Sequence, residues 1–226
     1  MERFQRQIGL MTNEQFEKLQ KANVLVVGVG GVGGYVCEML VRCGIGKLTI
    51  VDFDKVTKSN INRQIIALES TVGKYKVDVM KERLLDINPN LTIEAKNIKL
   101  RPDTIDTVVN NSYDYVVDAI DMLYSRIELI CYCKEHNINV VSSMGAGNRV
   151  DVPQYIVCDL YETRDDGLAR RLRKRLRKRQ ITSHDVVYCK SNPLCQDFVG
   201  SIAYHPSVCG ITLASYVVNQ IINKKN

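Results

Sequence analysis

The sequence contains no apolar run of the roughly 18 residues that a membrane-spanning helix needs. Its first 20 residues, MERFQRQIGLMTNEQFEKLQ, also lack the apolar core of a secretory signal. These two absences argue against a membrane-bound or secreted protein, and we expect a cytoplasmic one.

The eight cysteines form no C-x-x-C pair, which argues against a structural zinc site of ordinary spacing. In a cytoplasmic chain most of these thiols are expected to be reduced. Cys189 and Cys195 fall in a predicted loop, where a functional thiol stays an open alternative. The three histidines, His136, His184 and His205, are scattered along the chain, and none is assigned as a catalyst.

Acidic residues are absent from the segment 170–179, RRLRKRLRKR, which carries eight positive charges. The whole chain has a formal net charge of +6, so the rest of it, with 23 basic and 25 acidic residues, is close to neutral. The positive charge is therefore local and needs a local explanation. With 226 residues, the chain is long enough for one large α/β domain with a full core.

Strand and helix patterns alternate through the first 150 residues. Short β-branched runs predict strands at 24–27, 47–51, 91–98, 113–121 and 139–143. The segments around them predict helices at 12–22, 31–43, 73–87, 103–111 and 123–136. This alternation predicts an α/β fold with a Rossmann-like, mostly parallel sheet and helices on both faces.

The pattern changes after residue 150. The segments QYIVCDL, DVVYC and FVGSIAY, at 154–160, 185–189 and 198–204, predict short and possibly antiparallel strands. The basic segment lies between them as a helix, and a closing helix is expected at 206–222. We expect one domain over 1–226, with a nucleotide-binding core at 1–150 and a C-terminal elaboration at 151–226.

A glycine turn follows the first predicted strand. The segment GVGGVG has the G-x-G-x-x-G spacing, with Gly28, Gly30, Gly31 and Gly33. Such a turn allows close approach of a phosphate, and the helix after it offers free backbone N–H groups to an anion. Asp52 ends the next strand, where an acid can accept hydrogen bonds from ribose hydroxyls. These features predict nucleotide binding rather than a tight turn alone, but they do not separate NAD from ATP.

Charged and polar groups in the next loops favour ATP. Three loops at the expected carboxyl edge of the sheet supply cations for phosphates and acids for Mg²⁺, in the groups Asn60, Arg63, Gln64, Lys76, Asp118 and Asp121. Each charge alone reads more simply as a solvated surface group. Complementary groups on consecutive loops of one edge are typical of a triphosphate site.

At these residues the chain resembles the ThiF/MoeB/HesA adenylating family, relatives of ubiquitin-activating enzymes. The matching pieces run in family order over 3–126: RFQRQ, GVGGVG, VDFDKV, SNINRQ, GKYK, DAID and the later Arg126. The resemblance implies that ATP transfers AMP to a carboxylate. It also implies nucleotide contacts by Asp52 at the ribose, by Asp54 and Asp118, and by Asn60, Arg63, Gln64 and Lys76 at the phosphates.

The same resemblance implies that Asp121 holds Mg²⁺ and that Arg6 enters the site of a neighbouring subunit, which implies a homodimer. Met122 departs from the pattern, because many relatives have asparagine there.

The last third is similar to a bacterial branch of the family, the tRNA threonylcarbamoyladenosine dehydratases, in DDGLARRLRKRLRKR and GSIAYHPSVCGITLAS. That resemblance implies adenylation and cyclisation of N6-threonylcarbamoyladenosine in tRNA, with release of AMP and pyrophosphate. One alternative is adenylation of a ubiquitin-like sulfur carrier, with a sulfur-carrier or cysteine desulfurase partner. Another is a nucleotide-sensing protein without catalysis.

The basic segment has three interpretations. Leu168, Leu172 and Leu176 would form a narrow apolar stripe on a helix whose other faces are charged. The charge could simply keep this helix solvated, bind an anionic membrane, or contact nucleic acid through phosphates. We expect contact with tRNA by the eight cations Arg170, Arg171, Arg173, Lys174, Arg175, Arg177, Lys178 and Arg179.

Overall fold

The computed structural model describes residues 2–194 and 197–224 and contains one seven-stranded sheet. The strand order is β3-β2-β1-β4-β5-β7-β6. The strands are β1 Asn23–Val27, β2 Lys47–Val51, β3 Thr92–Lys96, β4 Tyr115–Asp118, β5 Val140–Ser143, β6 Tyr155–Asp159 and β7 Asp185–Cys189. Only β6 runs antiparallel to its neighbour, so the predicted mostly parallel α/β sheet is confirmed.

Helices precede, connect and follow these strands. The α-helices are α1 Gln5–Ile8, α2 Asn13–Lys21, α3 Gly33–Arg42, α4 Lys76–Ile87, α5 Ile105–Val108, α6 Leu123–Glu135, α7 Gly167–Lys178 and α8 Tyr204–Ile222. Four short 3₁₀ helices are η1 Glu2–Phe4, η2 Lys58–Asn60, η3 Glu69–Thr71 and η4 Leu160–Glu162. The helix expected at 103–111 is reduced to the single turn α5. No helix within the described ranges has the length and apolarity needed to cross a bilayer.

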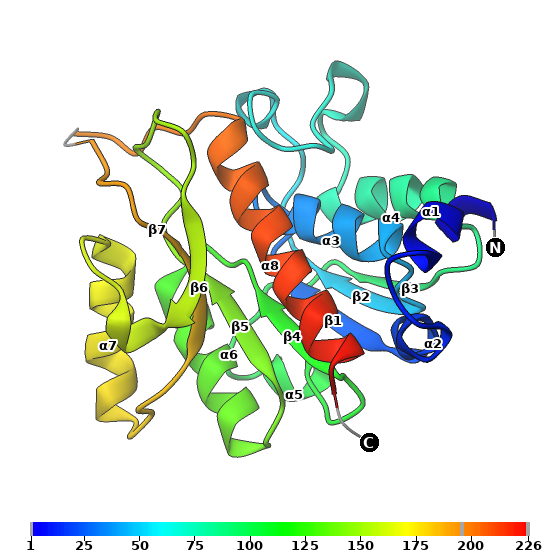
Figure 1. Ribbon diagram of the computed structural model, residues 1–226. Helices are drawn as coiled ribbons and strands as arrows, with labels where there is room; N and C mark the ends of the chain where they lie inside the picture. The colour runs from blue at the N-terminus through cyan, green and yellow to red at the C-terminus, as the bar shows by residue number, and fades with distance from the viewer. Residues whose placement is uncertain (1, 195–196, 225–226) are drawn as a thin grey trace.

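Helices cover both faces of the sheet because its central strands are apolar on both faces. Val24 and Val26 of β1 pack with α3, α4 and α8, whereas Leu25 and Val27 face α5 and α6. Figure 1 shows α8 crossing in front of the sheet beside α3, with α5 and α6 behind it. A third cluster joins α6 to α7 and the β6–β7 pair. The alternation of side chains along each strand therefore determines the two layers.

The C-terminal third extends the sheet instead of forming a separate one. Strand β7 runs parallel to β5 and antiparallel to β6, which confirms the predicted antiparallel pair. The strand expected at 198–204 is wrong, because 198–203 form a loop and α8 begins at Tyr204. The loop is held by reciprocal bonds between Asn148 and Gly200, while Phe198 and Val199 point away from the core at 69% and 85% exposure.

The thiols give no sign of an active cysteine among the described residues. Cys189 lies in strand β7 and not in a loop, and it is buried beside Ser191. Burial raises the pKa of the thiols of Cys37 and Cys209. The other loop candidate, Cys195, lies outside the described residues.

His184 should make folding sensitive to acid. Its ring is fully buried, Nε2 lies 2.7 Å from Ser142 Oγ, and burial lowers its pKa to about 3. An unfolded histidine titrates near about 6.5, so the unfolded chain binds more protons between those pH values and stability falls as pH falls. We expect a loss approaching about 1.4 kcal/mol per pH unit below about pH 6.

Urea unfolding at pH 7, 6 and 5 measures this loss in the wild type and in His184→Gln. The variant should lose less stability per pH unit, although it is less stable at pH 7. Equal slopes for the two proteins would show that another group carries the acid sensitivity.

Candidate functional site

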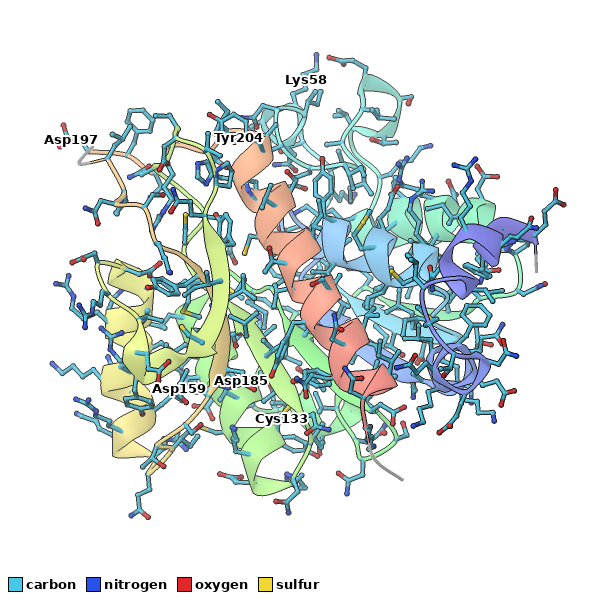
Figure 2. The ribbon with its side chains drawn as sticks, viewed as in Figure 1. Lys58, Cys133, Asp159, Asp185, Asp197 and Tyr204 are labelled. Atoms are coloured by element: carbon cyan, nitrogen blue, oxygen red, sulfur yellow. The ribbon has the colours of Figure 1, made fainter. Side chains whose placement is uncertain are left out.

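The carboxyl ends of β1, β2 and β4 meet at a cavity of 620 Å³. Parallel strands end at the same edge, so the loops that follow them converge there. Figure 2 shows Lys58, on the loop after β2, at the same end of the molecule as Tyr204, in the first turn of α8. The predicted residues that line the cavity are Gly28, Gly30, Gly31, Asp52, Asp54, Arg63, Gln64, Lys76 and Asp121.

The turn needs glycine at two positions because a side chain there would overlap the backbone. Gly28 has φ +92°, and a Cβ there would lie 2.5 Å from the Ala119 carbonyl oxygen. A Cβ on Gly33 would overlap the Gly28 carbonyl oxygen. Gly33 does not line the cavity and packs against the turn at the start of α3. Its expected contact with a nucleotide stays a prediction.

Asp52 holds the glycine turn against the end of β2. Its Oδ2 accepts the backbone N–H of Val29 at 2.7 Å, and its Oδ1 accepts that of Asp54 at 2.8 Å. A carboxylate has about four acceptor positions, so both oxygens can still accept bonds from hydroxyl groups. Asp52 therefore combines a structural role with a position in the cavity wall.

A buried cation lies beside Asp54. The Lys76 side chain is 7% exposed, and its Nζ lies 2.8 Å from Asp54 Oδ2. An ammonium group has three donors, so two of them stay available to a ligand in the cavity. Lys76 is the first residue of α4, and the loop before it pairs with the segment after β2 through the Lys55–Tyr75 bridge.

Arg63 and Gln64 face the cavity from the loop after η2. Arg63 donates to Ser59 O at 2.7 Å and to Asn62 Oδ1 at 2.9 Å, which orients its guanidinium and leaves other donors free. The Gln64 side chain is buried, and its Oε1 has no hydrogen-bond partner within the described structure. A buried amide without a partner favours a polar ligand here.

Asn60 and Arg6 are not in this cavity wall. Asn60 is buried and its Oδ1 accepts the Thr57 backbone N–H at 3.1 Å, so it shapes the loop that presents Arg63. Its expected contact with a phosphate stays a prediction. Arg6 is exposed on α1 and has no place in the cavity of its own chain.

The two acids after β4 have different surroundings. Asp121 is exposed at the cavity, whereas Asp118 is fully buried outside it, 3.1 Å from Arg126 Nε. Arg126 also donates to the Ile120 and Ser143 carbonyl oxygens. Burial raises the pKa of Asp118 and the Arg126 charge opposes that effect. Asp118 also accepts the Ile120 backbone N–H at 3.1 Å, so it supports the loop that carries Asp121. Its expected contact with the nucleotide stays a prediction.

Several wall residues are not among the predicted site residues. One part of the wall is mostly apolar and consists of Phe53, Ile98, Leu100, Met122 and Ser125. Another comes from later segments and consists of Ala146, Gly147, Val199, Ser201 and Pro206. Only the GSIAYHP motif points to the second group, because it contains Ser201 and Pro206.

The cations of the basic segment 170–179 fall into two groups, those that contact other parts of the protein and those that do not. Arg173 donates to the Leu160 and Thr163 carbonyl oxygens, Arg177 lies over the Tyr161 ring at 5.2 Å, and Arg179 pairs with Glu128 at 3.0 Å. Five are exposed without a bond or ion pair to the described chain: Arg170, Arg171, Lys174, Arg175 and Lys178.

The apolar side of α7 differs from the expected stripe. Ala169, Leu172 and Leu176 are buried, while Leu168 is partly exposed. The buried side chains pack against α6 in the third core cluster. The free cations therefore lie on a helix that is anchored along its length.

The cavity can hold an anionic ligand against a polar and cationic wall. The glycine turn, Arg63 and Lys76 provide donors for phosphates, and the apolar part suits a planar base. Asp121 provides an exposed carboxylate at the same edge. No group of three or more histidine, cysteine or acidic side chains able to hold a metal occurs in 2–194 or 197–224.

Comparisons with known proteins agree with this geometry. The model of the ThiF family matches residues 4–226. A Bacillus subtilis protein named tRNA threonylcarbamoyladenosine dehydratase is 34% identical over 242 residues, covering 98% of this chain and 95% of the relative. A Haemophilus influenzae protein of the same name is 42% identical over 169 residues, covering 75% of this chain. The match spans 65% of that protein, which is less than two thirds of its length.

A solved structure supports the same placement. The Escherichia coli tRNA N6-threonylcarbamoyladenosine dehydratase TcdA, in complex with ATP, superposes with a TM-score of 0.93. It is 32% identical, and the match covers 98% of this chain and 94% of that one.

Proposed function

Because the chain belongs to the ThiF family, we propose that it is an ATP-dependent enzyme that adenylates the carboxylate of N6-threonylcarbamoyladenosine in tRNA. The activated substituent then closes into a ring, and AMP and pyrophosphate are released. One observation carries this function. A single cavity combines the glycine turn, Arg63, Lys76 and Asp121, in a fold shared almost end to end with an ATP-binding dehydratase.

Different wall residues bind different parts of ATP. Asp52 accepts the ribose hydroxyls, and the apolar group around Phe53 and Leu100 receives the adenine. Backbone N–H groups after Gly30, together with Arg63, Gln64 and Lys76, donate to the phosphates. Fixed donors of this kind also stabilise the negative charge that develops as pyrophosphate leaves.

The reaction needs positioning and charge more than a protein nucleophile. A carboxylate oxygen of the substrate attacks the α-phosphorus, and the bond to pyrophosphate breaks. A nucleophilic atom of the same substituent then attacks the acyl carbon, loses its proton, and AMP departs. Attack within one substituent has an effective molarity of up to about 10⁵ M or more. No enzyme thiol is required, which agrees with the burial of five of the seven cysteines that the structure describes.

Asp121 is the residue that would hold Mg²⁺. Its exposed carboxylate at the cavity fits a cation that usually takes one or two carboxylates and completes its shell with phosphates and water. The cation supplies neutralisation of phosphate charge when bound.

We further propose that tRNA lies on the free cations of α7, that the protein is cytoplasmic, and that it is a homodimer in which Arg6 serves the partner's site. The exposed position of Arg6 outside its own cavity supports the last point. The sulfur-carrier alternative is not favoured, because the near full-length matches carry the dehydratase name.

Mass spectrometry of tRNA nucleosides tests the function directly. Purified protein, ATP and Mg²⁺ are incubated with tRNA that carries threonylcarbamoyladenosine, and with the same tRNA lacking the modification. We expect AMP release and a nucleoside lighter by one water, about 18 Da, only with the modified tRNA, since the ring closes with net dehydration. AMP release that instead requires a small protein ending in Gly-Gly would support the sulfur-carrier alternative.

A further inference from the structure

We propose that Asp166 is a positioning residue that fixes the basic helix α7 to the wall of the nucleotide cavity. A polyanion bound on α7 would then present its reactive group at a set distance from the bound ATP. This inference rests on the proposed function and concerns a residue outside the cavity wall.

The Asp166 carboxylate uses both oxygens, and each one holds a different element. Oδ1 accepts the Ala169 backbone N–H at 2.8 Å, which caps the start of α7. Oδ2 accepts the Gly145 backbone N–H at 3.1 Å. Gly145 directly precedes Ala146 and Gly147, which line the cavity. One buried side chain therefore joins the first turn of the basic helix to the cavity wall.

Arg149 strengthens the same junction. Its side chain is 3% exposed, and its Nη2 lies 3.8 Å from Asp166 Oδ2. The guanidinium also donates to the carbonyl oxygens of Gly147 and Ser191, at 3.2 and 3.1 Å. Arg149 therefore closes the loop 145–149 on itself and places a positive charge beside the Asp166 carboxylate. Because both groups are buried, water screens this attraction less than at the surface.

A capping role alone does not account for this arrangement. A helix N-cap needs one acceptor oxygen, which serine, threonine or asparagine also provides. The second oxygen, Oδ2, instead contacts the loop 145–149, through the Gly145 backbone N–H and the buried Arg149 side chain. The rest of α7 is held by other contacts, through Leu172, Leu176 and Arg173. Loss of the second oxygen should therefore loosen the junction without unfolding the helix.

The test compares tRNA affinity with turnover in Asp166→Asn, which keeps the capping oxygen and loses the acceptor for Gly145. We expect kcat at saturating modified tRNA to fall about tenfold, because a small misplacement of reacting groups is costly in rate. The Kd values for tRNA and for ATP should stay within about twofold of the wild type, because the α7 cations and the nucleotide wall are intact. Asp165→Asn is the matched control, since this exposed neighbour makes the same charge change without these contacts.

Two further variants separate positioning from folding and from binding. Gly145→Ala would place a Cβ 3.2 Å from Asp166 Oδ2, and it should lower kcat with tRNA affinity retained even if Asp166→Asn does not fold. Arg171→Glu combined with Lys174→Glu should instead weaken tRNA binding, which sets the scale for a binding defect.

Two outcomes overturn the proposal: weaker tRNA binding with unchanged kcat in Asp166→Asn, or no change in either quantity. The wild type in the same assay reports on the function itself. If it releases no AMP with modified tRNA, the proposed function fails, and this inference fails with it.

Discussion

Replacement of Asp121 by asparagine is expected to lower the rate of AMP release by about 10²–10³-fold, the usual cost of losing one group that stabilises developing phosphate charge. Asp121 is an exposed acid at the cavity, and it forms none of the ion pairs found among the described residues. Its charge is therefore available to a metal ion. The variant keeps the volume and removes the charge, so unfolding by heat should be unchanged within about 1 °C.

Two further measurements test whether the lower rate comes from weaker binding of Mg²⁺. The Mg²⁺ concentration for half-maximal turnover should rise in Asp121→Asn, while ATP binding in the presence of a chelator should be equal or tighter, because a like charge near the phosphates is gone. Asp103→Asn provides the control, since Asp103 is an exposed acid that is not part of the cavity wall. AMP release within about twofold of the wild type would remove Asp121 from the site.

Replacement of Arg126 by methionine is expected to destabilise the fold by about 3–5 kcal/mol, because it leaves the Asp118 carboxylate buried and unpaired. The side chains of Arg126 and Asp118 are 2% and 0% exposed, and the guanidinium also binds the Ile120 carbonyl oxygen. Urea unfolding at pH 7 measures the loss. The variant should also lose turnover, since Ile120 directly precedes Asp121.

A double mutant separates a buried charge from lost packing. Adding Asp118→Asn to Arg126→Met removes the unpaired charge and should recover part of the lost stability. Arg42→Met provides the comparison, because the Arg42 side chain is half-exposed and its partner Glu38 also pairs with Arg83. This variant should lose less than about 1 kcal/mol of unfolding free energy. If the double mutant is no more stable than Arg126→Met, an uncompensated Asp118 charge is not the cause.

The local patterns of the chain predicted most of the fold and the general place of the cavity. Short apolar runs fold as buried strands wherever they meet partners. Strands β2, β4 and β5 therefore lie at or within the predicted segments, and β1 begins one residue before its own. Parallel strands end at one edge, so Asp52, Arg63, Lys76 and Asp121 meet there. The segment 198–204 has the same local character, but residues 198–203 pair with no strand of the described sheet and form a loop, and Tyr204 begins α8.

What the chain sequence determined by itself was therefore the order of elements, the sheet edge where the cavity lies and the chemical kind of the groups that line it. Only the tertiary structure decided which of two similar residues serves which purpose. Asp118 and Asp121 lie three positions apart, yet one is buried against Arg126 and the other faces the cavity. Arg173 and Lys174 are adjacent, yet only Arg173 is held by the protein. The physical reason is that the partner of a charged side chain is set by segments distant in the chain, whose approach depends on how the whole core packs.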